Sequence, residues 1–319
     1  MTKILFVIVF LVMVVGALFS WFYQPLMGVV SVSDLDEKLK VGFIYLGPPG
    51  DHGWTYQHDQ GRLALERDLG DQVETVYVEG VPEEGPAAEE ALERLVNDGA
   101  TLIFTTSFGY MESTLKVAKR YPHVKFEHAT GYKRSENVST YSSRFYEGRY
   151  VSGQIAGHLS KTGQAGYVAS FPIPEVMRGI NAFLLGAQSV NPEFRMKVIW
   201  VNSWFDPDKE ANAAKKLIDQ GADILTQHTD STAVVQIAEE NKVLAFGQAS
   251  DMTPFAPDYL LTSIINNWGD YYTARTKAVL EGSWFSTDTF GGMDVNMVVM
   301  GAFKNMPEQV KRSAKATTK

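Results

Sequence analysis

The residues best suited to contact a small molecule lie in loops that follow apolar, strand-like runs. The first such loop, residues 47–56, presents Trp54 and Thr55. Its glycines have the spacing G-x-x-G-x-x-G, and Pro48 and Pro49 lack the backbone N–H groups that a phosphate site needs. The loop therefore suits a flat ring with polar edges better than an anion. The alternative role for Trp54 is to fill the end of a sheet.

A second aromatic loop, residues 202–207, follows another apolar run and contains the adjacent Trp204 and Phe205. The Asp-Pro pair at 206–207 is typical of a helix start, with the aspartate as the N-cap. Trp204 then occupies the place that Trp54 occupies after the earlier strand. Two aromatic side chains that reach one cleft from opposite sides would clamp a planar ring.

Further loops after predicted strands bring polar side chains to the edge of a sheet where α/β proteins bind ligands. These loops are residues 227–230, 248–251 and 266–268. Asp230 could instead cap the next helix, and His228 could be a core imidazole. The candidate ligand-binding residues are Trp54, Thr55, Phe108, Thr130, Trp204, Phe205, His228, Asp230, Asp251 and Asn266.

Catalytic chemistry finds little support in the sequence. There is no G-x-S-x-G elbow, no cysteine and no H-E-x-x-H motif. His52 and His58, each beside an aspartate, could be imagined as a metal or acid/base pair, but a spacing of six residues does not bring them together on a helix. We therefore expect a protein that is not an enzyme and that needs no metal and no cofactor.

The composition limits the partners. The chain of 319 residues has 37 acidic and 29 basic residues and a formal net charge of −8, so nucleic acid is not an expected partner. The absence of cysteine excludes disulfides and a lipid-modified cysteine. About 285 residues follow Asp34, which favours two lobes over one domain.

An uncharged run from Ile4 to Phe22 precedes this part of the chain. Its length suffices to cross about 30 Å of hydrocarbon as a helix. A cleavable signal peptide has a shorter apolar region and a small-x-small cleavage site, which residues 18–22 do not offer. We expect residues 1–33 to be a signal anchor, with a signal peptide as the alternative, plus a linker. The region 34–319 is then exported to the periplasmic or extracellular face.

Strand-like and helix-like runs alternate through the exported region, as in a βαβ series with a parallel sheet. The first expected elements are a strand at 73–78, a helix at 87–98, a strand at 101–106, a helix at 111–120 and a strand at 124–129. The segment 95–103 is similar to 217–225, so the pattern repeats and predicts two α/β lobes. Between them, the glycines of 144–159 favour close helix packing.

Several motifs in this region resemble one known family. They are Gly-x-x-x-Asp-x-Gly-Trp-Thr at 47–55, Asn137-Val138 before Phe145-Tyr146-Glu147-Gly148, Ile173-Pro174 with Arg178-Gly179, and Gly221-Ala222-Asp223-Ile224. With these residues the chain, from Val41 to about Val310, resembles the basic membrane protein family of ABC transporter substrate-binding proteins, similar to purine nucleoside receptor (PnrA-like) lipoproteins.

The resemblance implies the type I periplasmic-binding-protein fold, an α/β architecture of two Rossmann-like lobes with parallel sheets and a hinge. The ring-stacking aromatics of the family correspond to Trp54 and Trp204. The implied division is lobe 1 at 41–142 plus 248–265, lobe 2 at 160–247 plus 268–319, and hinge crossovers near 143–160, 247–250 and 265–268. The resemblance also implies an ABC transporter permease as partner, and we expect a monomer. Relatives continue beyond 311–315, so a truncated second lobe is an open alternative.

Departures from the family bear on the ligand. Thr130 stands where nucleoside-binding relatives have an aspartate, and Ala249 and Asn266 align with their acidic and lysine residues for ribose. Because unpaired buried polar groups cost about 1–3 kcal/mol each, a pocket without these groups favours a base over a nucleoside. We therefore expect an extracytoplasmic solute-binding protein that prefers an adenine-type nucleobase. A purine nucleoside receptor and a membrane-anchored ligand sensor of the same fold are the alternatives.

Overall fold

The computed structural model describes residues 38–50 and 52–318. The expected membrane anchor at residues 4–22 lies outside this part. Among the helices of the described residues, none combines the length and the apolar character needed to cross a membrane.

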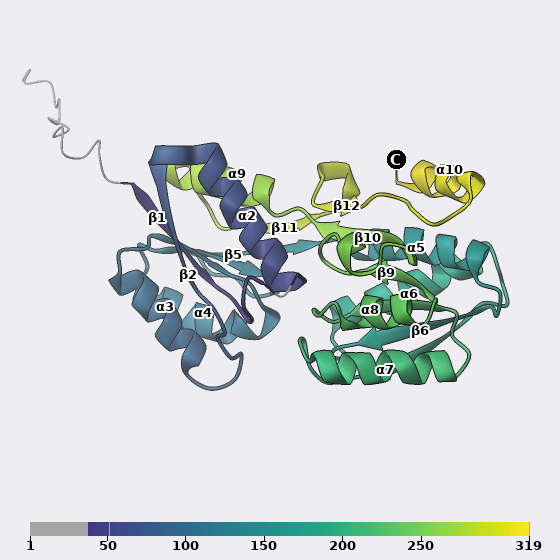
Figure 1. The fold of residues 1–319 in the computed structure, drawn as a ribbon. Coiled ribbons are helices and arrows are strands. Elements are labelled where there is room, and N and C mark those ends of the chain that lie inside the picture. The colour runs from purple at the N-terminus through teal and green to yellow at the C-terminus, as the bar shows by residue number, and fades with distance from the viewer. Residues whose placement is uncertain (1–37, 51, 319) are drawn as a thin grey trace, which may run out of the picture. The chain divides into compact units, whose positions relative to one another are not determined.

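The first lobe is built on a six-stranded sheet in which every strand pair is parallel. The strand order is β11-β5-β4-β3-β1-β2. Figure 1 labels β1, β2, β5 and β11 of this sheet. The strands are β1 (Leu39–Ile44), β2 (Val73–Val78), β3 (Leu102–Thr105), β4 (Lys125–Ala129), β5 (Val138–Ser143) and β11 (Asp288–Gly291). The helices are α2 (Trp54–Leu69), α3 (Ala87–Asn97), α4 (Met111–Arg120) and α9 (Gly269–Leu280).

Alternate side chains of β1 enter two separate cores. Phe43 lies in one cluster with Leu65 of α2. Ile44 lies in another cluster with Leu92 of α3. Because side chains alternate along a strand and both faces of the sheet are covered by helices, the strand is buried throughout its second half. The loops that leave its carboxyl end therefore start from a rigid frame.

The second lobe repeats this arrangement with the strand order β12-β10-β9-β8-β6-β7. All its strand pairs are parallel except the antiparallel pair β10 and β12. The strands are β6 (Gln164–Ala169), β7 (Arg195–Trp200), β8 (Ile224–His228), β9 (Leu244–Gly247), β10 (Leu260–Asn266) and β12 (Val298–Met300). The helices are α5 (Tyr146–Leu159), α6 (Pro174–Gln188), α7 (Pro207–Asp219), α8 (Ala233–Glu240) and α10 (Glu308–Thr317).

Helices α5 and α6 approach each other closely through glycines. A Cβ atom added to Gly153 would lie 2.0 Å from the carbonyl oxygen of Phe183, and one added to Gly186 would lie 2.1 Å from that of Tyr150. Side chains at these two positions would therefore force the helices apart. Gly153 and Gly157 of α5 therefore serve helix packing, as predicted, whereas Gly148 lies against Ile264 of β10.

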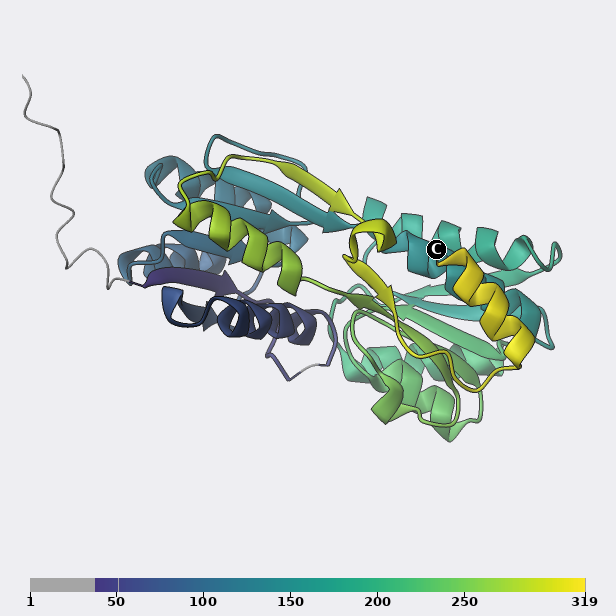
Figure 2. The same ribbon diagram turned by 90° about the horizontal axis from the view of Figure 1, so that it is seen from above.

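The described chain passes between the two sheets three times, near 143–146, 266–269 and 291–298 (Figure 2). The crossing expected at 247–250 is replaced by the one at 291–298. Strand β10 pairs with β9, so 248–265 belongs to the second lobe and not to the first. Conversely, α9 packs on α2 and β11 pairs with β5, so these parts of 268–319 belong to the first lobe. The physical reason is that β11 is a short edge strand with exposed residues, whose partner no local hydrophobic pattern reveals.

Candidate functional site

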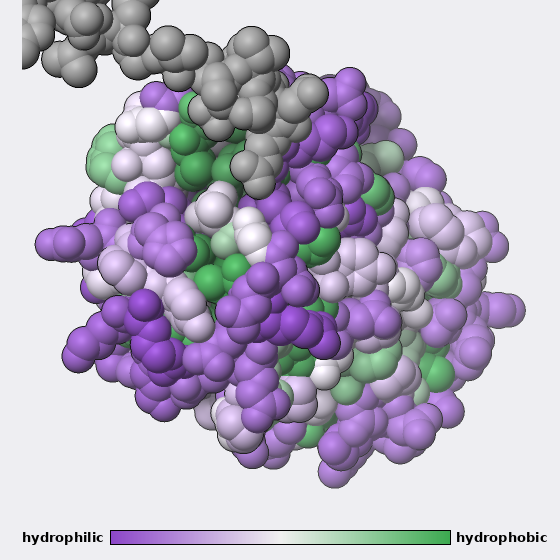
Figure 3. All heavy atoms as spheres, turned by 90° about the vertical axis from the view of Figure 1, so that its left-hand side faces the viewer, coloured by the Kyte–Doolittle hydropathy of each residue, from purple (hydrophilic) through white to green (hydrophobic). Residues whose placement is uncertain are grey.

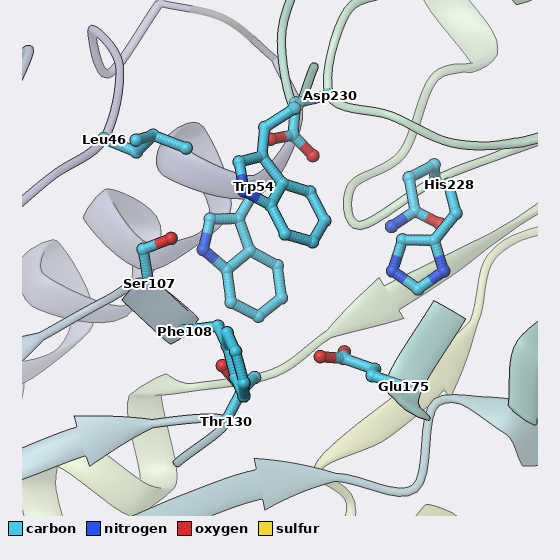
Figure 4. Close-up of a pocket in the computed structure, with 10 residues that line it drawn as sticks. Leu46, Trp54, Ser107, Phe108, Thr130, Glu175, His228 and Asp230 are labelled. Carbon is cyan, nitrogen blue, oxygen red and sulfur yellow. The ribbon is translucent and has the colours of Figure 1, made fainter. Parts of the chain in front are cut away.

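A pocket lies between the two lobes, at the carboxyl ends of both sheets (Figure 4). The cavity volume is about 20 Å³, within about 350 Å³ of space that includes open solvent. The first lobe contributes Leu46, Trp54, Ser107, Phe108 and Thr130, and the second lobe contributes Glu175, Trp204, His228, Asp230 and Gln248. Each side of the pocket thus comes from one lobe, and ligands of open α/β sheets bind at this end of the strands.

Trp54 is the first residue of α2, and a hydrogen bond from the polar edge of its ring holds the side chain in place. Its indole N–H donates a hydrogen bond to the carbonyl oxygen of Thr106 at 2.5 Å. The ring meets Trp268 edge to face, with centroids 5.7 Å apart and planes at 78°. Trp54 remains half-buried and lines the pocket, so it both closes the end of the sheet and presents part of its ring to the cleft.

Trp204 lines the pocket from the loop after β7. Its indole N–H donates to Oε2 of Glu83, a residue of the first lobe, at 3.1 Å. The backbone N–H of Asp230 donates to its carbonyl oxygen at 2.8 Å, which ties two pocket loops together. Asp206 caps α7, because its Oδ1 accepts from the backbone N–H of Lys209 at 3.1 Å, as predicted.

The polar wall of the pocket rests on a buried cation. Arg149 of α5 is fully buried, donates to Thr226 Oγ1 at 2.8 Å and also donates to Gln248 Oε1. Among the described residues it forms no ion pair. Because Arg149 occupies the amide oxygen of Gln248, the NH₂ group of Gln248 is the donor that can face the pocket.

His228 and Glu175 form the rest of this wall (Figure 4). Burial lowers the pKa of His228 well below its usual value, and the charge of Arg149 lowers it further, so the imidazole is neutral. Its Nδ1 has no hydrogen-bond partner among the described residues. Burial raises the pKa of Glu175 to about 7, against the opposing effect of Arg178 and Arg149. The wall therefore offers both hydrogen-bond donors and acceptors.

Six of the ten residues predicted for the site line this pocket. They are Trp54, Phe108, Thr130, Trp204, His228 and Asp230. The His228 imidazole is buried but lines the pocket, so it has features of both expected roles, a core imidazole and a ligand-binding residue.

The other four predicted residues lie elsewhere. Thr55 is buried, and its hydroxyl accepts from the backbone N–H of Gly47 at 3.2 Å, which closes the loop. Phe205 is 41% exposed on the surface. Asp251 is exposed and accepts a hydrogen bond from the backbone N–H of Thr253 at 3.0 Å.

Asn266 is the fourth of these residues and lies at a crossing between the lobes. It is fully buried, and its Oδ1 accepts from Ser143 Oγ at 2.8 Å. Ser143 ends β5 and Asn266 ends β10, so this hydrogen bond joins two of the connecting segments. The geometry gives Asn266 a place in the hinge, outside the pocket lining.

The sequence reasoning did not include four lining residues: Leu46, Ser107, Glu175 and Gln248. Ser107 and Gln248 belong to loops whose other members were considered. Glu175 has a local explanation as the acidic residue in the first turn of α6. Its position after β6 is the signal that could have identified it. Within the described residues, no group of three or more His, Asp or Glu side chains could hold a metal ion.

Comparison with known proteins places the chain among solute-binding proteins. Residues 38–318 match the family model described as ABC transporter substrate-binding protein PnrA-like. A Brucella abortus protein named as purine-binding is 62% identical over 282 residues, covering 88% of this chain and 80% of the relative. A Haloferax volcanii protein named as a putative ABC transporter glucose-binding protein is 40% identical, covering 88% of this chain and 71% of the relative.

Solved structures show the same fold. An ABC transporter solute-binding protein from Conexibacter woesei superimposes with a TM-score of 0.72 at 19% identity, over 88% of this chain and 95% of the other. A transcriptional activator of the comK gene from Bacillus halodurans superimposes with a TM-score of 0.75 at 24% identity, over 88% and 96%. The architecture is that of the type I periplasmic-binding proteins, as expected.

Proposed function

Because the chain belongs to the PnrA-like family of ABC transporter substrate-binding proteins, we propose that its ligand is a purine, with an adenine-type base preferred. The ligand lies in the pocket between the lobes, and the loaded protein delivers it to the permease of an importer. The purine-binding name of the relative with 62% identity supports the ligand class.

The observation that carries the proposal is the pair of tryptophans on opposite lobes. Trp54 and Trp204 both line the pocket, and each uses its indole N–H in a hydrogen bond to the protein. The polar edge of each ring is therefore occupied, so a ligand in the pocket meets the apolar surface of the rings. Stacking of a base on an aromatic side chain is worth about 1–3 kcal/mol.

The polar wall complements the edge of a purine. Neutral His228 carries one donor and one acceptor, and Gln248 adds its NH₂ group. Glu175, as a carboxylate, accepts a hydrogen bond from a ring N–H. A free base has such an N–H on its five-membered ring, whereas a nucleoside carries its sugar on that nitrogen. This difference favours the base over the nucleoside.

Location and assembly complete the proposal. The region after residue 34 is extracytoplasmic, residues 4–22 anchor it to the cytoplasmic membrane, and the protein acts as a monomer. Figure 3 shows one face of the described molecule as mainly hydrophilic, with small separate apolar patches. Such a surface suits a protein without a permanent partner on that face. A membrane-anchored sensor is the alternative. A purine uptake assay in cells that keep the permease but lack this protein separates the two, because only loss of a transport protein abolishes uptake.

Calorimetry on residues 34–319 tests the ligand class. The panel is adenine, guanine, hypoxanthine, their nucleosides and glucose. We expect adenine to bind most tightly. Tighter binding of the nucleosides would overturn the preference for a base, and binding of glucose alone would overturn the purine proposal in favour of the sugar named for the Haloferax volcanii relative.

A further inference from the structure

Glu83 connects the two lobes without lining the pocket. It lies in the loop between β2 and α3 and is half-buried. Its Oε1 accepts hydrogen bonds from Ser107 Oγ at 2.5 Å and from the backbone N–H of Gly109 at 2.7 Å, both in the first lobe. Its Oε2 accepts from the indole N–H of Trp204, in the second lobe, at 3.1 Å.

The partners of Glu83 surround the aromatic walls of the pocket. Ser107 and Gly109 flank Phe108, and both Phe108 and Trp204 line the cavity. A Cβ atom on Gly109 would lie 2.6 Å from the carboxyl carbon of Glu83, so the close approach of the carboxylate depends on glycine there. One carboxylate therefore holds both the loop that carries Phe108 and the indole N–H of Trp204.

We propose that Glu83 is a positioning residue that latches the lobes in the closed state. When the cleft closes, the N–H of Trp204 reaches the carboxylate, and its indole ring is held at the orientation needed for stacking. When the cleft opens, this hydrogen bond must break, whereas the bonds to Ser107 and Gly109 remain within one lobe. The proposal rests on the proposed function only for the identity of the stacked ligand.

A second contact between the lobes provides a comparison. Ser250 Oγ, in the loop after β9, donates to the backbone carbonyl oxygen of His52 in the first lobe. Neither residue lines the pocket. Loss of this contact should weaken closure without changing the orientation of Trp204, whereas loss of the Glu83 contact should affect both.

Glu83→Gln is the discriminating variant. The amide oxygen can still accept from Ser107 and Gly109, but the NH₂ group then faces the N–H of Trp204, and two donors cannot pair. We expect ligand release to become about tenfold to a hundredfold faster, the range for loss of a hydrogen bond to a charged group. Glu84→Gln, at the exposed neighbouring carboxylate, is the matched control and should leave the release rate unchanged.

The coupling to Trp204 is tested by a double-mutant cycle. Trp204→Phe removes the N–H donor from the other lobe, so Glu83→Gln should have no further effect on release in that background. Trp204→Phe also tests this hydrogen bond from the second lobe, in case Glu83→Gln disturbs the loop that carries Glu83. An equal effect of Glu83→Gln in both backgrounds would show that the carboxylate acts within its lobe alone and would overturn the proposal.

Closure can be measured without any purine. The chain has no cysteine, so spin labels can be attached at Lys119→Cys of α4 and Lys215→Cys of α7, both exposed. We expect Glu83→Gln to shift the distances between the labels toward longer values. Ser250→Ala should lengthen these distances too, but its effect should be the same in the Trp204→Phe background. Unchanged distances in Glu83→Gln would overturn the latch. Failure of every purine to bind would refute the proposed ligand while leaving this measurement decisive for the latch.

Discussion

The carboxyl group of Glu175 and the imidazole of His228 line the same pocket wall, and burial displaces their pKa values in opposite directions. Burial disfavours the charged form of each group, so the acid titrates near 7 while the histidine stays neutral. The pocket therefore contains one group whose charge changes close to physiological pH.

Adenine affinity should rise with pH through the titration of Glu175. The carboxylate, which accepts a ring N–H, increases from about a tenth of the population at pH 6 to about nine tenths at pH 8. Affinity should increase by up to about tenfold over this range, measured by calorimetry. Glu175→Gln should bind with the same affinity at both pH values. A fall in affinity with pH, or an unchanged slope in the variant, would show that Glu175 does not accept from the ligand.

The same carboxyl group should make the ligand-free protein less stable at high pH. Its pKa is about 7 in the folded state, against an ordinary value of 4.5. The favourable contribution of the protonated form is therefore complete below about pH 4.5 and is lost as the pH rises through 7. At pH 8 Glu175→Gln should raise the free energy of unfolding by about 1–3 kcal/mol, and at pH 5 by much less. Urea unfolding at both pH values measures the difference, and an effect independent of pH would contradict it.

The aromatic clamp predicts a contrast between two adjacent side chains. Trp204→Ala and Trp54→Ala should each weaken purine binding by about 1–3 kcal/mol, the scale of one aromatic–base stack. Phe205→Ala is the control, because Phe205 is 41% exposed and lies outside the pocket lining. Calorimetry should show an unchanged affinity for this variant. If Phe205→Ala bound purine as weakly as Trp204→Ala does, the loop as a whole and not the indole ring would determine binding.

Much of the fold follows from local patterns. The strand at 73–78 and the helix at 111–120 have the bounds that their periodicity predicts. Strand β11 was not identified, because it is short, half of its four residues are exposed, and its strand character depends on pairing with β5. The assignment of β10 to the first lobe was wrong because β10 pairs with β9, the strand just before it, and the hydrophobicity of a buried strand does not show which sheet it joins.

The aromatic part of the site was easier to predict than its polar part. Trp54 and Trp204 stand out because large side chains at strand ends have few structural uses. Polar residues in similar loops have several structural uses. Asp251 caps a local turn, and Asn266 accepts a hydrogen bond across the hinge from Ser143. Glu175 was overlooked because its place in the first turn of α6 already accounts for a carboxylate.

Closure of the cleft depends on a glycine at position 53. A Cβ atom there would lie 2.0 Å from the backbone carbonyl oxygen of Asp230 in the opposite lobe, so the two loops can meet only without a side chain. The obstructing atom belongs to the backbone and cannot rotate away. Gly53→Ala should therefore prevent full closure and weaken ligand binding by about 1–3 kcal/mol, the usual cost of overpacking.

Gly50, in the same loop, is the matched control, because a Cβ atom there would meet nothing within 4 Å. Gly50→Ala should bind ligand as the unmodified protein does, and small-angle scattering should show that it still contracts when ligand is added. Gly53→Ala should keep its helical circular dichroism but fail to contract. Full contraction and unchanged affinity in Gly53→Ala would mean that the loops do not approach this closely in the ligand-bound state.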